Sequence, residues 1–114
     1  MVNERDKAVI RHILKYCYEV EQIIQMFDTT FETLKTNVAY KNSCAMSILQ
    51  IGELTTHFSK DFLNNNKKVP WGRMKKMRNI AAHHYGEFDL NILYDTIMND
   101  IPELKEYCLE LLSL

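Results

Sequence analysis

Apolar residues recur every three or four positions along the N-terminal part of the chain. The pattern comprises Ile10, Ile13, Leu14, Cys17, Val20, Ile24 and Phe27. Because this spacing places them on one face of an α-helix, it predicts a long first helix over about residues 4–27. The polar run Asp28-Thr29-Thr30 ends that helix. Thr29 and Glu32 have the spacing of a capping box, which predicts the start of the next helix.

A second helical region follows and extends to a polar loop. Its apolar side comprises Leu34, Val38, Ala45, Ile48, Leu49, Ile51, Thr55, Phe58 and Phe62. The polar residues Tyr40 to Ser43 predict a break or a kink within it. The run Asn64-Asn65-Asn66-Lys67-Lys68 has neither apolar side chains nor a helical pattern, so it predicts a loop.

The C-terminal half predicts further, shorter helices. Pro70 suits the first turn of a third helix, which carries Trp71, Met74, Met77, Ile80 and Ala81 and ends at Gly86. Asp89 is placed to cap a fourth helix, and the pair Asp100 and Glu103 is placed to start or restart a last one. Long helices with short loops predict an all-α fold, an antiparallel bundle of four to five helices in which residues 1–114 form one domain.

The composition narrows the setting in which the chain works. Hydrophobic residues make up 46% and charged residues 25% of the sequence, the balance of a soluble globular protein. No run approaches the roughly 20 apolar residues that span a bilayer, and the charged N-terminus does not resemble a signal peptide. Cys17, Cys44 and Cys108 lie on or near apolar stripes without CxxC or zinc spacing, which predicts reduced core residues. We therefore expect a cytoplasmic protein.

Charge is distributed unevenly along the chain. Six basic residues and no acidic one lie between Lys67 and Arg78, whereas residues 86–114 hold seven acidic residues and one lysine. On a chain with a net charge of −1, such a basic patch indicates a local anionic ligand rather than general coating of nucleic acid. The alternative is a solvated helix face.

Candidate chemistry follows directly after the basic run, in the segment Arg78-Asn79-Ile80-Ala81-Ala82-His83-His84-Tyr85. On a helix that turns about 100° per residue, Asn79 and His83 share one face, and Arg78 and Tyr85 share another. Arg78 and His83 diverge by about 140°, so one straight helix does not easily bring both to one atom. Local unwinding near Gly86, or a second copy of the helix from another subunit, would bring them together.

A metal site does not fit this segment. His83 and His84 are adjacent and diverge by about 100° on a helix, and the HExxH and HxxxH spacings are absent. We therefore expect no metal and no other cofactor. From the chemistry of the residues alone, a purely structural role of the segment stays open as the alternative.

Arg78, His83 and Tyr85 together form an R-x4-H-x-Y pattern. It resembles the R-x(4–6)-H motif of HEPN ribonucleases, and the added tyrosine resembles the HepT toxin branch of that superfamily in particular. The similarity extends over essentially the whole chain. Further features that support it are Asn79, the segment Val69-Pro70-Trp71 and the segment Ile51-Gly52-Glu53.

The resemblance implies an all-helical homodimer, with the motif helices of both subunits facing one cleft, and metal-independent cleavage of RNA. Arg78 would hold the scissile phosphate, and His83 would exchange a proton with the ribose 2′-OH or the leaving oxygen. Asn79 would orient His83 or the phosphate. Residues that would bind the RNA backbone are Lys67, Lys68, Arg73, Lys75 and Lys76.

The resemblance also implies a partner, an MntA-like nucleotidyltransferase antitoxin of a type VII toxin–antitoxin system. That partner would neutralise the toxin by attaching AMP to Tyr85. Two alternatives stay open. The chain could be a non-catalytic HEPN subunit that binds nucleotides or a nucleotidyltransferase, or a helical adaptor in which the motif is accidental.

Overall fold

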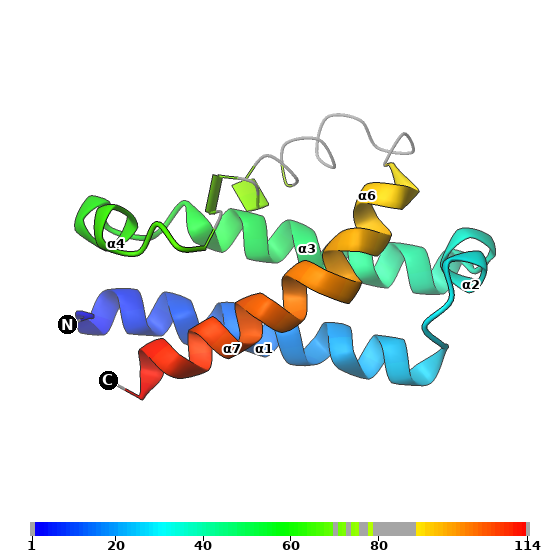
Figure 1. The fold of residues 1–114 in the computed structure, drawn as a ribbon, viewed down its shortest axis with the longest axis horizontal. Helices are drawn as coiled ribbons and strands as arrows, with labels where there is room; N and C mark the ends of the chain where they lie inside the picture. Colours follow the sequence, from blue (N-terminus) through cyan, green and yellow to red (C-terminus); the bar gives the residue numbers. More distant parts are fainter. Residues whose placement is uncertain (1, 70, 73, 76–77, 79–88, 114) are drawn as a thin grey trace.

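The computed structural model describes residues 2–69, 71–72, 74–75, 78 and 89–113 (Figure 1). Within these ranges the chain is helical and contains no strand, which confirms the predicted all-α class. The elements in chain order are α1 (Glu4–Met26), α2 (Phe31–Thr36), α3 (Val38–Thr55), α4 (Lys60–Asn65), α6 (Leu90–Asp95), the π-helical turn η1 (Thr96–Asp100) and α7 (Ile101–Leu112).

The core lies between α1, α3 and α7. α1 and α3 run side by side in opposite directions, as predicted, and α7 packs across α1 (Figure 1). Fully buried apolar side chains from the three helices meet there, among them Ile10, Ile13, Val20, Ile48, Ile51 and Leu104. Their removal from water is the main favourable contribution to folding. None of the helices in the described ranges is long and apolar enough to cross a membrane.

The three cysteines belong to this core. Cys17, Cys44 and Cys108 are buried and free, as predicted. Burial raises the pKa of the Cys44 and Cys108 thiols to about 12, and it also raises the pKa of Cys17. Because the thiolate is the reactive form, these cysteines are inert structural residues near neutral pH.

The turn between α1 and α2 differs from the prediction by one residue. Thr30, and not Thr29, caps α2, because its hydroxyl accepts a hydrogen bond from the Thr33 backbone N–H at 3.2 Å. Asp28 holds Thr30 in this position, because its carboxylate accepts hydrogen bonds from the backbone N–H and from the hydroxyl of Thr30, each at 2.9 Å. The predicted capping box of Thr29 with Glu32 is therefore wrong. The Thr29 carbonyl instead accepts a hydrogen bond from the Tyr94 hydroxyl at 2.6 Å.

The second helical region contains three helices, with breaks at places other than the one predicted. Asn37 ends α2 and caps α3 by accepting from the Tyr40 backbone N–H, so residues 40–43 are continuously helical. α3 ends at Thr55, and Ser59 caps α4. α4 continues through Asn65, so the loop begins at residue 66 and not at residue 64 as predicted.

A buried carboxylate ties the start of α4 to the start of α1. Asp6 is 2% exposed, and it accepts hydrogen bonds from the backbone N–H and the hydroxyl of Ser59 at 2.9 and 2.7 Å. Both of its oxygens are thus paired, as a buried charge requires. This contact fixes the end of the bundle from which the following loop departs.

The helices α6, η1 and α7 follow one another without a gap, and the middle one is a wider π-helical turn. Asp89 caps α6 as predicted, and α7 begins at Ile101, directly after Asp100, in agreement with the predicted restart, although Asp100 makes no side-chain capping bond. The π-helical turn η1 ends at Asp100, two residues before Pro102, which has no N–H to donate and whose ring crowds the preceding turn. A wider turn at that point lets the helix continue into α7.

Candidate nucleic-acid site

The structure describes part of the predicted site. Arg78, Lys67, Lys68 and Lys75 lie within the described residues, whereas Asn79, His83, Tyr85, Arg73 and Lys76 lie outside them. Trp71, Gly72, Met74, Lys75 and Arg78 are helical, in agreement with the predicted third helix. The predicted contributions of Pro70, Met77, Ile80, Ala81 and Gly86 to that helix fall outside the described residues.

The start of this segment is held by an aromatic cluster. The Trp71 ring is 7% exposed and lies 4.9 Å from the Phe58 ring and 5.6 Å from the Phe62 ring between centroids. Its indole N–H donates to the Asn66 carbonyl at 2.8 Å, so the buried nitrogen is satisfied. Trp71 therefore anchors the segment next to α4.

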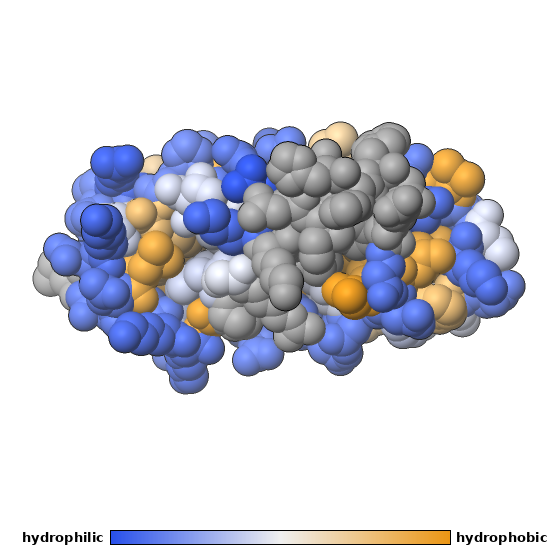
Figure 2. Space-filling view, turned by 90° about the horizontal axis from the view of Figure 1, so that it is seen from above, coloured by the Kyte–Doolittle hydropathy of each residue, from blue (hydrophilic) through white to orange (hydrophobic). Residues whose placement is uncertain are grey.

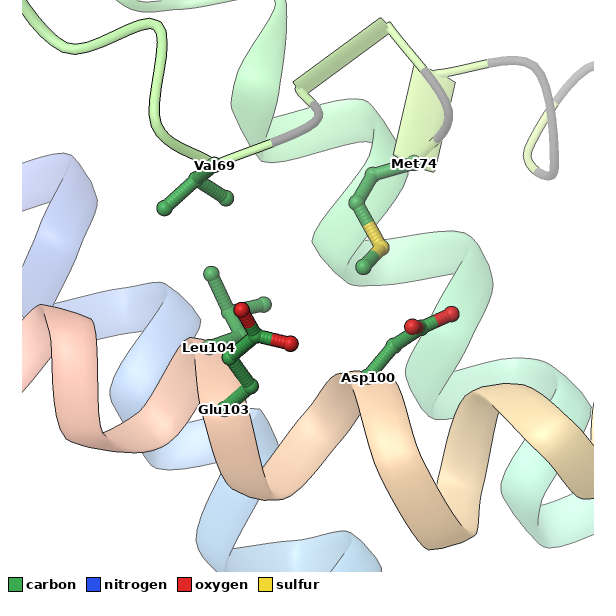
Figure 3. A pocket seen from close by; sticks show the side chains of 5 residues that line it. All are labelled: Val69, Met74, Asp100, Glu103 and Leu104. Carbon is green, nitrogen blue, oxygen red and sulfur yellow. The ribbon is translucent and has the colours of Figure 1, made fainter.

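Met74 continues the apolar side of the same segment. It is 2% exposed and lines a small cavity together with Val69, Leu104, Asp100 and Glu103 (Figure 3). The cavity has a volume of about 20 Å³, enough for one water molecule and too small for a nucleotide. This cavity therefore cannot hold a nucleotide, and Met74 serves to pack the segment against α7.

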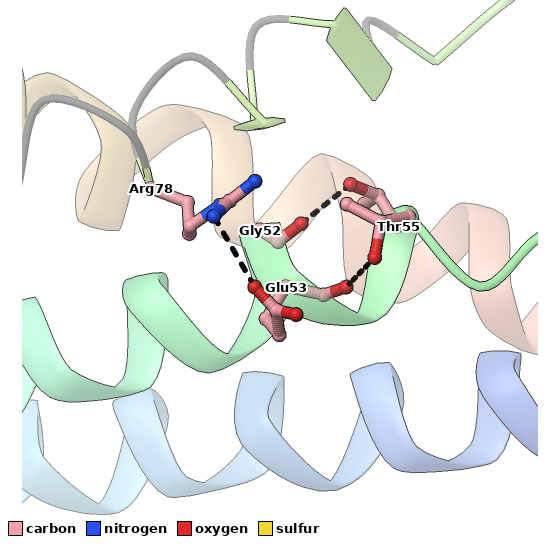
Figure 4. Close-up of polar contacts among 5 residues, drawn as sticks. Gly52, Glu53, Thr55 and Arg78 are labelled. Carbon is pink, nitrogen blue, oxygen red and sulfur yellow. Dashed lines mark hydrogen bonds and ion pairs between the residues drawn. The ribbon is translucent and has the colours of Figure 1, made fainter. Parts of the chain in front are cut away.

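Arg78 lies directly on α3, at Gly52 (Figure 4). A β-carbon added to the buried Gly52 would collide with the Cβ atom of Arg78, lie 2.7 Å from the Met74 carbonyl oxygen and lie 3.2 Å from Arg78 Cγ. These distances leave no room for any side chain. Gly52 therefore permits the close approach of two helical segments, and it sets the height of Arg78 above α3.

The guanidinium of Arg78 pairs with the residue that follows Gly52. Its Nη1 lies 3.5 Å from Glu53 Oε2, and the side chains are 27% and 54% exposed, respectively (Figure 4). The Arg78 Nε atom is buried and makes no hydrogen bond within the described part of the chain. The arginine stem is thus covered, while its terminal group lies near solvent beside the Glu53 carboxylate.

The last turn of α3 is a firm platform for these contacts. The Thr55 hydroxyl donates to the Gly52 carbonyl at 2.7 Å (Figure 4). The Thr56 hydroxyl donates to the Glu53 carbonyl at 2.7 Å. Both carbonyls belong to the final turn, where the regular partners four residues further on are missing, and the Glu53 carbonyl also accepts a hydrogen bond from the Thr56 backbone N–H at 3.1 Å. The two threonines satisfy them, so the backbone beneath Arg78 is held on both sides of the contact.

The basic side chains that the structure describes face solvent. Lys67, Lys68 and Lys75 are exposed, and Lys68 Nζ lies 6.0 Å from the centre of the Tyr107 ring. On the face shown in Figure 2, hydrophilic residues cover most of the described surface, and apolar side chains form smaller patches toward its two ends. This exposure agrees with either predicted role of the basic patch, an anion site or a solvated face.

The described residues offer no obvious place for a metal ion. Within them, no group of three or more His, Cys, Asp or Glu side chains is arranged to hold one. His83 and His84 fall outside these residues, so only their spacing in the sequence speaks against a metal ion at that pair.

The contact of Arg78 with Gly52 and Glu53 was not predicted. The sequence contained one signal for it, because a glycine inside a helical apolar pattern indicates a close approach of another backbone. Spacing alone could not show which segment approaches. The segment Ile51-Gly52-Glu53 entered the sequence argument only as part of a family resemblance, without a structural role.

Comparison with known proteins defines the class to which this helical bundle and its arginine belong. The family model described as "Ribonuclease HepT-like" matches residues 13–111. This range covers most of the chain, including the entire R-x4-H-x-Y motif. The chain therefore belongs to the HepT-like ribonuclease family, which confirms the resemblance seen in the sequence.

Similar curated proteins carry ribonuclease names. The "Putative RNase" of Caldanaerobacter subterraneus subsp. tengcongensis is 29% identical over 108 residues, which are 94% of each chain. A "Putative RNase" of Methanocaldococcus jannaschii is 30% identical over 69% of this chain and 66% of its own length. The "Probable ribonuclease HepT" of Thermococcus cleftensis is 36% identical over 48% of this chain and 50% of its own. No solved structure was found to match the chain. Family and names together indicate a ribonuclease.

Proposed function

We propose that this chain is the toxin of a type VII HepT/MntA-like toxin–antitoxin system and cleaves RNA without a metal ion. The observation that carries the proposal is Arg78, the first residue of the motif. It lies on α3 with a covered stem and a guanidinium near solvent, as a phosphate-binding arginine requires. The family membership supports the same reaction class.

The proposed reaction uses the RNA as its own nucleophile. His83 removes the proton of a ribose 2′-OH, and the freed oxygen attacks the adjacent phosphorus. The bond between phosphorus and the 5′-oxygen breaks, and that oxygen takes up a proton. The products are a 2′,3′-cyclic phosphate and a 5′-hydroxyl end. Arg78 stabilises the charge that develops on the phosphate oxygens, and Asn79 orients His83 or the phosphate.

The basic patch is proposed to bind the RNA backbone. Lys67, Lys68 and Lys75 are exposed and can reach phosphates without rearrangement. Arg73 and Lys76 are assigned the same role from the sequence. Because such contacts release counterions, binding should weaken as the salt concentration rises.

Assembly and regulation complete the proposal. A homodimer would bring the motif helices of two subunits to one cleft, which would overcome the divergence of Arg78 and His83 on a single helix. A nucleotidyltransferase antitoxin would attach AMP to Tyr85, two residues after His83. The added phosphate would occupy the place of the substrate phosphate and repel it.

The test is RNA cleavage by the purified protein in EDTA. We expect cleavage of bulk tRNA by the wild type, and losses of about 100-fold or more in Arg78→Ala and His83→Ala, the range typical for removal of an acid–base or phosphate-stabilising group. Arg11→Ala and His12→Ala are matched controls, because both residues are exposed on α1. Full cleavage by a folded His83→Ala variant would remove that residue from the mechanism.

The same experiment separates the alternatives. A wild-type protein that binds nucleotides or a nucleotidyltransferase, but leaves RNA intact, would be the non-catalytic subunit. A protein without either activity would be an adaptor. Intact-mass measurement after co-expression with an MntA-like nucleotidyltransferase tests the modification, since AMP should be absent from a Tyr85→Phe variant.

A further inference from the structure

Glu53 is the acidic residue that faces the proposed phosphate-binding arginine. Among the described residues, it is the carboxylate within ion-pair distance of Arg78, with Nη1 and Oε2 3.5 Å apart. Half of the Glu53 side chain is exposed, so water screens the pair and it contributes little to the stability of the fold.

The geometry restricts the arginine at two points. Gly52 lets the Cβ and Cγ atoms of Arg78 rest on the backbone of α3, which fixes the root of the side chain. Glu53 contacts the far end at Nη1, 3.5 Å from Oε2, which restricts the rotation of the guanidinium. Between these points, Nε is buried without a hydrogen bond in the described residues, so it does not contribute to the orientation.

We propose that Glu53 is a positioning residue for Arg78. Together with Gly52 it holds the guanidinium in one orientation, so that the N–H groups turned away from the carboxylate meet the phosphate of a bound RNA. The inference rests on the proposed ribonuclease function and adds a residue that acts through Arg78 without touching the substrate. An arginine that is already oriented loses less conformational freedom when it binds the transition state.

This role differs from that of a competitor for Arg78. If Glu53 merely occupied the phosphate site in the free protein, its removal would strengthen RNA binding and leave the chemical step intact. Removal of a positioning residue, by contrast, slows the chemical step. Its removal lowers kcat, while ground-state binding stays the same or improves because one negative charge near the RNA is lost.

The first experiment measures kcat and KM for tRNA cleavage in three variants. Glu53→Ala should lower kcat about 10- to 100-fold, the size of effect that a misplaced catalytic group produces, with KM unchanged or lower. Glu53→Gln keeps a hydrogen-bond acceptor for Nη1 and should recover part of that loss. Glu106→Ala removes another exposed carboxylate, from α7, and should behave as wild type. Circular dichroism and thermal unfolding check that each variant is folded.

A second measurement is independent of activity. Nitrogen-detected NMR of the arginine side chains reports how fast each guanidinium rotates, and the Arg78 signal is assigned by its loss in Arg78→Lys. We expect slow rotation in the wild type and in Glu106→Ala, and faster rotation in Glu53→Ala. Equal rotation in Glu53→Ala and wild type would overturn the inference even in a protein that does not cut RNA.

The outcomes for the two proposals are distinguishable. If the wild type cuts RNA, Arg78→Ala does not, and Glu53→Ala keeps the wild-type kcat, then the ribonuclease assignment stands and the positioning role is wrong. Lower KM with unchanged kcat in Glu53→Ala would likewise overturn it in favour of competition. If no RNA is cut under any condition, the proposed function fails and the catalytic part of this inference fails with it.

Discussion

The α1–α3–α7 core and the helical segment that carries Arg78 are held in place by different kinds of contact. In the core, Ile13, Ile48 and Leu104 are at most 1% exposed and share their packing with many similar side chains. The described residues of the segment 69–78 are held by specific contacts with the bundle. Trp71 and Met74 anchor its apolar side, and Arg78 rests on Gly52 beside Glu53.

This difference separates stability from the placement of the site. A core made of many interchangeable apolar contacts carries most of the folding free energy and tolerates conservative changes. The position of Arg78, by contrast, depends on the absence of one side chain at Gly52. Substitutions in the core should therefore change the free energy of unfolding most, whereas substitutions at the platform should change activity out of proportion to stability.

The largest effect on stability is expected in the core. Leu104→Ala removes a side chain that is 1% exposed, and it should lower the free energy of unfolding by about 2–5 kcal/mol. Leu109→Ala is the matched control on the same helix, since Leu109 is 41% exposed and its truncation should cost about 0.5 kcal/mol or less. Urea unfolding followed by circular dichroism measures both. Similar losses in the two variants would contradict the assignment of the core.

The core was also the part that the sequence predicted best. The three/four spacing of residues such as Ile13 and Cys17 predicts α1 almost to its ends, because burial of one face is what makes a helix of that length stable. The same argument predicts that all three cysteines are buried and reduced. The spacing of apolar residues predicts this helix well because the residues of the pattern pack against the same core.

Helix boundaries were harder to predict, because several polar residues of the same type compete for one role. Thr29 and Thr30 are chemically equivalent caps, and Asp28 decides between them through two hydrogen bonds to Thr30. Asn37 breaks the second helical region by capping α3 with its side chain, although residues 40–43 are the more polar stretch. Such choices depend on backbone geometry that spacing does not contain.

The candidate site was predicted in part. Arg78 was found from its place in a motif, and the family match supports that motif. Its contact with Gly52 and Glu53 joins residues 25 or more positions apart in the chain, and a single sequence contains no information on which segments meet. The roles of His83, Tyr85 and the basic residues stay predictions.

A smaller but more specific effect is expected at the platform. Gly52→Ala should lower the free energy of unfolding by about 1–3 kcal/mol, because the new methyl group overlaps Arg78 and the Met74 carbonyl. It should also lower RNA cleavage, since the segment must move away from α3. Unfolding and cleavage are measured on the same preparation, so that activity is expressed per folded molecule.

Gly72→Ala is the matched control for that substitution. Gly72 is helical and exposed, and a β-carbon added there meets nothing within 4 Å. Because alanine is the better helix former, this variant should be about 0.5–1 kcal/mol more stable than wild type. Cleavage should be unchanged. If Gly52→Ala behaved like Gly72→Ala, the close approach at Gly52 would not be what places Arg78.

The smallest effect is expected at the turn between α1 and α2, which is held by side-chain hydrogen bonds and takes no part in the core or the platform. Thr30→Ala removes the cap of α2 and should lower the free energy of unfolding by about 1 kcal/mol. Thr29→Ala is the control, because Thr29 contributes its backbone carbonyl to Tyr94 and an alanine keeps that carbonyl. An equal loss in both variants would restore Thr29 as a cap.

The pH dependence of the stability difference between Thr30→Ala and wild type tests whether Asp28 holds Thr30 in place as the cap of α2. Hydrogen bonds from the Thr30 N–H and from the Thr33 and Thr30 hydroxyls lower the pKa of Asp28 below its ordinary value of 3.8. A lowered pKa in the folded state stabilises the fold above that ordinary value, and the contribution is lost as the pH falls through the folded pKa.

Thr30→Ala removes one of the three donors, so the gap in stability between this variant and wild type should narrow as the pH falls below about 4. Thr29→Ala keeps all three donors and should follow the wild-type pH profile throughout. Thermal unfolding between neutral pH and pH 3 measures both, and parallel profiles for Thr30→Ala and wild type would show that Asp28 does not act through Thr30.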